Sequence, residues 1–158
     1  MSESRITEIL EKYKSGSEFL LCDYDTDVDI AVPKQYSITT LAKKATLTIR
    51  IKYNALATVV LNTGLVIGTG GSAYVGAALP FSKRDEANTS APLTELKVDY
   101  LLGSSGQAAG TMIYQELQLP NMETVIKKRL KASTKYGLVI TTIADNNYGS
   151  VIFELDED

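Results

Sequence analysis

Aspartates occupy every second position of a short run near the start of the chain, CDYDTDVD (22–29). Carboxylates at this spacing begin calcium-binding loops, which also need glycine at position six and a bidentate acid at position twelve. Counted from Asp23, those positions hold Val28 and Lys34, so the calcium pattern is broken. We interpret the run as a solvated turn near 25–27 or a charged edge strand. Pairing with basic residues of a partner subunit, and a metal site completed from elsewhere, are the less favoured alternatives.

Composition limits the catalytic chemistry that the chain can perform. Its 158 residues include no histidine and a single cysteine, Cys22. Histidine is the usual general base and the commonest transition-metal ligand, so Ser-His-Asp, Cys-His and histidine-zinc chemistry are excluded. One cysteine cannot form an internal disulfide, and we expect Cys22 to be a small buried residue on a strand. Catalysis by carboxylates, lysine or tyrosine remains open.

A glycine pattern of the form G-x-G-x-x-A runs from Gly68 to Ala73, and Asp99 follows about thirty residues later. In a dinucleotide-binding unit the glycines let a pyrophosphate approach a helix N-terminus, and the acid holds a ribose. The segment that would form this helix contains Tyr74, Val75 and Gly76 and stops at Pro80. We therefore interpret the pattern as a loop, and we expect neither a cofactor nor a metal.

The elements that position these residues begin with one amphipathic helix, predicted within residues 1–16. Apolar residues recur there at helical spacing, and they are Ile6, Ile9, Leu10 and Tyr13. Ser4 can cap the first turn and Gly16 can end the helix. A helix of this length is marginal alone in water, so its apolar stripe must rest on the domain, a sister subunit or another protein. We predict that it is a docking element.

After Gly16 the hydrophobic period changes to two, which predicts a single β-domain over residues 17–158. Apolar and polar residues alternate most clearly in 46–54 (TLTIRIKYN), which gives one buried and one solvated face. The strands that we predict are 18–24, 28–32, 46–54, 57–62, 65–68, 95–102, 111–119, 124–130, 135–144 and 149–155. Many short strands with no helices between them are typical of an all-β, antiparallel β-sandwich.

Charge and hydropathy limit the partners. The chain has 16 basic and 19 acidic residues and a formal net charge of −3, which argues against broad nucleic-acid or anionic-membrane binding. The N-terminus is too polar for a signal peptide, and no apolar run approaches the length of a membrane span. We expect a soluble protein that is synthesised in a cytosol.

Several segments resemble small virion proteins of tailed bacteriophages. The resembling segments are 48–54 (TIRIKYN), 79–84 (LPFSKR), 130–141 (LKASTKYGLVIT), 144–147 (ADNN) and 150–154 (SVIFE). The resemblance implies a jelly-roll β-sandwich, a trimer, and a place on the virion as a head decoration (cement) protein or as part of a fibre. The group's loop motif reads Pro-aromatic-Asn-Arg-Asn-Arg, whereas this chain has Ser82 and Asp85 in place of the asparagines.

These observations together predict a virion structural protein without enzymatic activity, synthesised in a bacterial host and bound to the major capsid protein. The hydrophobic content of 44 % in a small sandwich with edges to protect also favours a homotrimer. The residues predicted to bind partners are Ile6, Ile9, Leu10, Tyr13, Lys83 and Arg84. One alternative is a tail-fibre or receptor-binding module that recognises a cell-surface glycan, with Tyr136 or Tyr148 stacking on a sugar. A small carboxylate-dependent or cofactor-binding enzyme is the alternative from another class.

Overall fold

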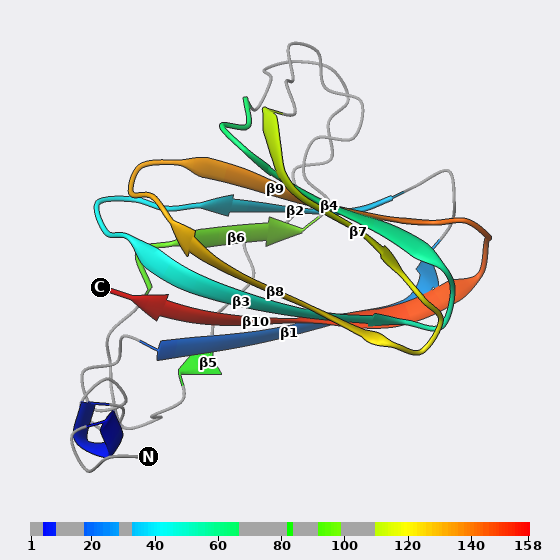
Figure 1. Cartoon of the computed structure of the whole chain (residues 1–158), viewed down its shortest axis with the longest axis horizontal. Coiled ribbons are helices and arrows are strands. Elements are labelled where there is room, and N and C mark those ends of the chain that lie inside the picture. The colour runs from blue at the N-terminus through cyan, green and yellow to red at the C-terminus, as the bar shows by residue number, and fades with distance from the viewer. Residues whose placement is uncertain (1–4, 9–17, 29–32, 67–81, 84–91, 99–109) are drawn as a thin grey trace.

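A computed structural model describes residues 5–8, 18–28, 33–66, 82–83, 92–98 and 110–158. These residues form two antiparallel five-stranded sheets packed face to face (Figure 1). The strands are β1 (Glu18–Val28), β2 (Lys34–Thr39), β3 (Ala45–Tyr53), β4 (Ala57–Thr63), β5 (Ser82–Lys83), β6 (Glu95–Val98), β7 (Thr111–Gln118), β8 (Glu123–Leu130), β9 (Lys135–Thr142) and β10 (Asn147–Glu157). Sheet I has the order β5-β1-β10-β3-β8, and sheet II has the order β6-β2-β9-β4-β7. The predicted β-sandwich is confirmed.

The strand order is that of a jelly roll. When the short strands β5 and β6 are set aside, sheet I reads β1-β10-β3-β8 and sheet II reads β2-β9-β4-β7. Among these eight strands the chain crosses between the sheets at every connection except that from β4 to β7, which both belong to sheet II. Eight strands arranged as two nested Greek keys have this order. The two added strands lie in the long β4–β7 connection, and each extends one sheet by pairing with β1 or β2.

The core lies between the sheets because apolar residues alternate along the inner strands. Every second residue of β3 from Ala45 to Tyr53 is buried, as are Val151, Phe153 and Leu155 of β10. Sheet II covers them with buried residues of its own, Tyr36, Ile38, Val59, Leu61, Leu138 and Ile140. The rings of Tyr36 and Phe153 meet edge to face at 5.0 Å between centroids. Each such side chain contributes roughly 1.5–3 kcal/mol by leaving water.

The strands at the start of the domain differ from the prediction. We expected a turn near 25–27, but β1 continues through these residues to Val28. The predicted strand 28–32 lies, beyond Val28, outside the described residues, and the next described strand is β2, Lys34–Thr39. The irregularity after Asp25 is a bulge, where the pairing with β10 shifts before Val28. A bulge lets a strand bend without ending. Cys22, which we expected to be buried, is exposed, because it lies one position out of phase with the inward residue Leu21.

Two other predicted segments fall largely outside the described residues. The described part of the N-terminal segment is a helical turn over residues 5–8, in which Ile6 is 46 % exposed. Ile9, Leu10 and Tyr13 lie outside the described residues, as does the glycine pattern from Gly68 to Ala73. Among the described residues, no helix is long and apolar enough to cross a membrane.

A buried carboxylate fixes the long β4–β7 connection to the last strand. Glu157 is 5 % exposed at the end of β10 and accepts hydrogen bonds from the backbone N–H groups of Leu93 and Thr94, at 3.1 and 2.6 Å. A carboxylate that accepts two backbone N–H groups satisfies donors that burial would otherwise leave unpaired. The segment that leads into β6 is therefore held against the C-terminal strand.

Gly149 makes room for a buried aromatic ring. It pairs with Tyr53 across β10 and β3, and a Cβ at position 149 would lie 2.4 Å from two atoms of the Tyr53 ring. Tyr53 is 1 % exposed, so its ring has little freedom to move away.

Replacing Gly149 with alanine should therefore destabilise the fold by about 1–3 kcal/mol, the usual cost of overpacking a core. Denaturant unfolding followed by circular dichroism measures this change. Ser150→Ala, at the next position and on the outward face, is the control and should leave the unfolding midpoint close to wild type. Equal stability of Gly149→Ala and wild type would show that the Tyr53 ring does not pack across Gly149.

Candidate functional site

Two of the four aspartates point between the sheets. Asp23 and Asp25 follow Phe19 and Leu21 on the inner side of β1, and they face Lys34 and Tyr36 of β2. The Lys34 ammonium lies 3.1 Å from Asp25 Oδ2 and 3.6 Å from Asp23 Oδ2. The Tyr36 hydroxyl donates to Asp23 at 2.8 Å.

For Asp23 and Asp25 this arrangement corrects the interpretation as a solvated turn or charged edge, whereas Asp27 is exposed near the end of β1 and Asp29 lies outside the described residues. The basic partner belongs to the same chain, and the carboxylates form a polar cluster (Asp23, Asp25, Lys34 and Tyr36) at the margin of the core. The Lys34 side chain is 9 % exposed, against 19 % for Asp23 and 30 % for Asp25. A charge this buried needs its counter-charges, since an unpaired ion in the interior is costly. The cluster therefore joins the two sheets electrostatically.

Of the predicted partner-binding residues, the structure describes only Ile6 and Lys83. Ile6 is exposed in the N-terminal helical turn, and Lys83 pairs with Phe19 as part of the short strand β5. Arg84 lies outside the described residues, with Ile9, Leu10 and Tyr13. The contact that we predicted for the N-terminal helix and for the Lys83–Arg84 pair stays a prediction.

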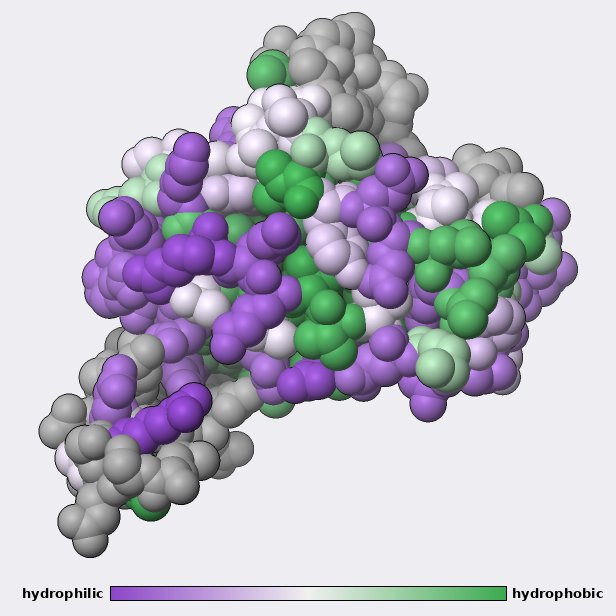
Figure 2. Space-filling model, viewed as in Figure 1, coloured by the Kyte–Doolittle hydropathy of each residue, from purple (hydrophilic) through white to green (hydrophobic). Residues whose placement is uncertain are grey.

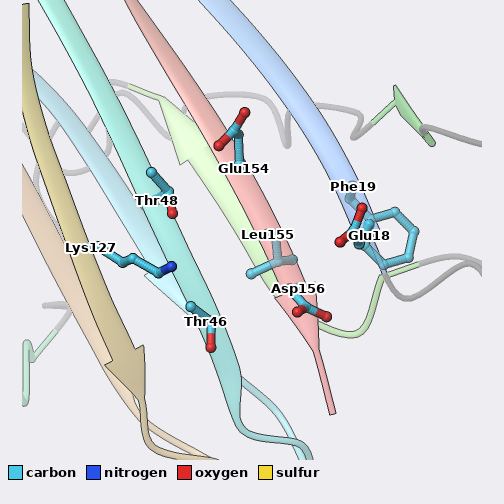
Figure 3. A pocket seen from close by; sticks show the side chains of 8 residues that line it. All are labelled: Glu18, Phe19, Thr46, Thr48, Lys127, Glu154, Leu155 and Asp156. Carbon is cyan, nitrogen blue, oxygen red and sulfur yellow. The ribbon is translucent and has the colours of Figure 1, made fainter. Parts of the chain in front are cut away.

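A shallow hollow crosses the outer face of sheet I (Figure 3). Its volume is about 170 Å³, and Thr46 and Thr48 of β3 line its centre. Lys127 reaches toward them from β8, whereas Glu154 and Asp156 stand on β10 and Glu18 on β1. Glu154 also lies 3.9 Å from the Arg50 guanidinium. Charges of both signs line the hollow, and such a surface can pair with complementary charges of another protein.

Apolar residues are exposed around the turn that joins β7 and β8. We call this set the edge surface, and it consists of Leu117, Leu119, Met122 and Val125, which are 46–59 % exposed. Figure 2 shows apolar side chains gathered at the right-hand end of the view, where Figure 1 places this turn. The turn is tight, since the Met122 N–H donates to the Leu119 carbonyl at 3.1 Å. The two strands are the outer strands of their sheets, so the edge surface combines apolar side chains with strand edges.

Polar residues close the same side of the sandwich between β7 and β8. Tyr114 and Lys128 both lie on inward positions, and the Lys128 ammonium is 5.9 Å from the centre of the Tyr114 ring. The Tyr114 hydroxyl donates a hydrogen bond to Glu116. Burial, this hydrogen bond and the Glu116 charge together raise the pKa of Tyr114 to about 12. Tyr114 thus stays neutral at physiological pH and keeps donating to Glu116.

The two tyrosines considered for sugar binding have different environments. Tyr136 is 3 % exposed, and its hydroxyl accepts the backbone N–H of Lys131 at 2.8 Å, so it is a core residue. Tyr148 is 59 % exposed on the outer face of β10. The structure therefore leaves only Tyr148 of this pair available to a ligand.

Comparisons with known proteins do not assign a family: no protein-family model matches the sequence, and a search of curated proteins finds no match. Within the part of the chain that the structure describes, no group of three or more acidic or sulfur side chains is placed to hold a metal ion. The surfaces described above are thus the basis for a functional proposal.

The polar cluster predicts a specific loss of stability. Lys34→Met should destabilise the protein by about 3 kcal/mol, because it leaves two half-buried carboxylates side by side on β1 without the Lys34 counter-charge. Thermal or urea unfolding measures this change.

The matched control is the triple variant Asp23→Asn/Asp25→Asn/Lys34→Met, which removes all three charges together. It should recover most of the lost stability, since a neutral cluster of similar volume has no unpaired ion to bury. If Lys34→Met unfolds like wild type, the ion pairs contribute nothing to the joining of the sheets.

Proposed function

We propose that this chain is a structural protein of a tailed-bacteriophage virion, a decoration (cement) protein that binds the major capsid protein and stabilises the head shell without enzymatic activity. The observation that carries the proposal is the jelly-roll strand order, which is the fold implied by the phage-like segments between residues 46 and 155. Jelly rolls are common in viral capsid proteins. A shared fold does not by itself imply a shared function, so the proposal also depends on the surfaces that could contact other subunits.

The edge surface supports an assembled state. Outer strands with exposed apolar side chains tend to pair with another chain, and single-chain proteins usually protect such edges with charges or coverings. Leu119 and Met122 stand at the turn itself, where a neighbour can reach both sheets at once. We infer that the edge surface binds a sister subunit and that three subunits close into a ring.

The N-terminal segment and the Lys83–Arg84 pair are the proposed contacts with the shell. Ile6 exposes an apolar side chain in the described helical turn, and an amphipathic helix of this kind gains stability when its apolar face fits a groove of a neighbour. The basic side chains of Lys83 and Arg84 can pair with acidic groups on the capsid.

Binding to phage heads that were assembled without this chain tests the function. The purified protein should bind such heads to a saturating occupancy, and deletion of residues 1–16 should lower that occupancy while leaving the melting temperature nearly unchanged, because the segment precedes the sandwich. Failure of the full-length protein to bind at saturating concentration would overturn the proposal. Full occupancy by the deletion variant would show that the loops of the sandwich, and not residues 1–16, make the contact with the shell.

Sedimentation tests the ring. The wild-type chain should sediment as three protomers at micromolar concentration, and Leu119→Asp/Met122→Asp should sediment as one, because charges at the edge surface would be buried unpaired in the contact. Leu41→Asp is the matched control, since Leu41 is 44 % exposed and lies between β2 and β3. A wild-type monomer, or a double variant that stays trimeric, would contradict this use of the edge surface.

A further inference from the structure

Two exposed tyrosines stand beside a pocket at one end of the outer face of sheet I. The pocket has a volume of about 340 Å³, and its lining residues include Tyr24 of β1 and Tyr148 of β10. Tyr24 is 77 % exposed and Tyr148 is 59 % exposed. Aromatic rings are usually placed where they lose contact with water, so two exposed rings at one pocket are a feature that a ligand can use.

The strand register brings the two rings to the same face. Tyr24 pairs with Ser150, and Tyr148 lies two residues before Ser150 on β10, so the tyrosines are diagonal neighbours. Diagonal neighbours on a sheet are separated by about 7–8 Å, which is within reach of aromatic side chains. Two hydrogen bonds to Asn54 fix the Tyr148 backbone. The Tyr148 N–H donates to the Asn54 side-chain oxygen at 2.9 Å, and the Asn54 N–H donates to the Tyr148 carbonyl at 3.0 Å.

Hydrogen-bonding side chains surround the rings. Lys52 and Asn54 come from the end of β3, Ser150 from β10, and Asn121 from the β7–β8 turn. Asn121 has a left-handed backbone with φ of 59°, and its N–H donates to the Tyr53 carbonyl at 2.8 Å. Asp25 and Thr26 of β1 also line the pocket. It therefore offers an ammonium, a carboxylate, two carboxamides and two hydroxyls, which supply both donors and acceptors.

This combination fits a carbohydrate. A pyranose ring has an apolar face of C–H groups, which can pack on an aromatic ring, and a rim of hydroxyls, which need both donors and acceptors. Ligand sites of this size are mostly apolar, with a few polar groups that fix the orientation. We propose that the pocket between Tyr24 and Tyr148 binds a pyranose residue of a glycan, with the tyrosine rings as the stacking surface and Lys52, Asn54 and Asn121 as hydrogen-bonding groups.

The proposal is independent of the head shell, because the ligand is tested on the purified full-length chain. Saturation-transfer NMR with a panel of oligosaccharides built from glucose, galactose, N-acetylglucosamine or glucuronic acid should show transfer to the ring C–H protons of at least one sugar. Tyr24→Ala and Tyr148→Ala should each weaken binding of that sugar at least tenfold, as loss of a stacking surface does. Both tyrosines are exposed, so the melting temperatures of these variants should stay close to wild type.

Conservative variants separate stacking from a general effect on the surface. Tyr24→Phe retains the ring and should bind within about threefold of wild type. Met112→Ala removes an exposed apolar side chain from β7, outside the pocket lining, and should leave binding unchanged. Absence of transfer to every sugar on the panel would overturn the proposal. Binding that survives both tyrosine-to-alanine substitutions would overturn it as well, since the sugar would then lie elsewhere.

Discussion

The register of β10 between β1 and β3 determines both the core and the surfaces of this protein. β10 pairs with β3 from Gly149–Tyr53 to Glu157–Ala45 without a shift. Because side chains alternate between faces, a slip of one residue would expose Val151 and Phe153 and place Glu154 in the core. The same register sets the outer face, where Tyr24, Ser150 and Lys52 form one row across three strands. One pairing thus places the core side chains and aligns the outward residues that line the proposed carbohydrate pocket.

The alternation of apolar and polar residues predicts the sandwich from the sequence, but it does not predict β2 or the edge surface. In β3 every inward residue is apolar, so the strand and its buried face follow directly from the pattern. β2 does not show such a pattern, because its first inward residue is Lys34. Lys34 is buried because Asp23 and Asp25 pair with it from the other sheet. Cross-sheet pairing of this kind leaves no local periodicity. The edge surface was missed for a similar reason. The predicted strand 111–119 included Leu119, whereas β7 ends at Gln118, and Met122 lies between the predicted strands, so no strand pattern indicates that the two residues share one turn.

The alternation of inward and outward residues also predicts which of the two tyrosines is buried. Tyr136 has the same phase as Leu138 and Ile140, which places it in the core, whereas Tyr148 has the phase of Ile152 and Glu154, which places it outside. Phase alone therefore separates the two candidates for sugar binding. The second ring of the pocket, Tyr24, could not be found in this way, because its neighbour on β10 depends on a pairing between segments more than a hundred residues apart.

The two proposed surfaces meet at the β7–β8 turn. Asn121 lines the proposed carbohydrate pocket, while Leu119 and Met122, which flank it in the sequence, belong to the edge surface. A sister subunit bound at the edge surface would lie beside the pocket and add its own atoms to that wall. We expect an open pocket of this kind to bind a single sugar weakly. Its few contacts must offset the translational and rotational entropy that the sugar loses on binding. A closed ring would present three such pockets to one polysaccharide, and linked binding events raise the overall affinity without any new contact. Assembly would then convert a weak site on each subunit into strong attachment of the whole ring.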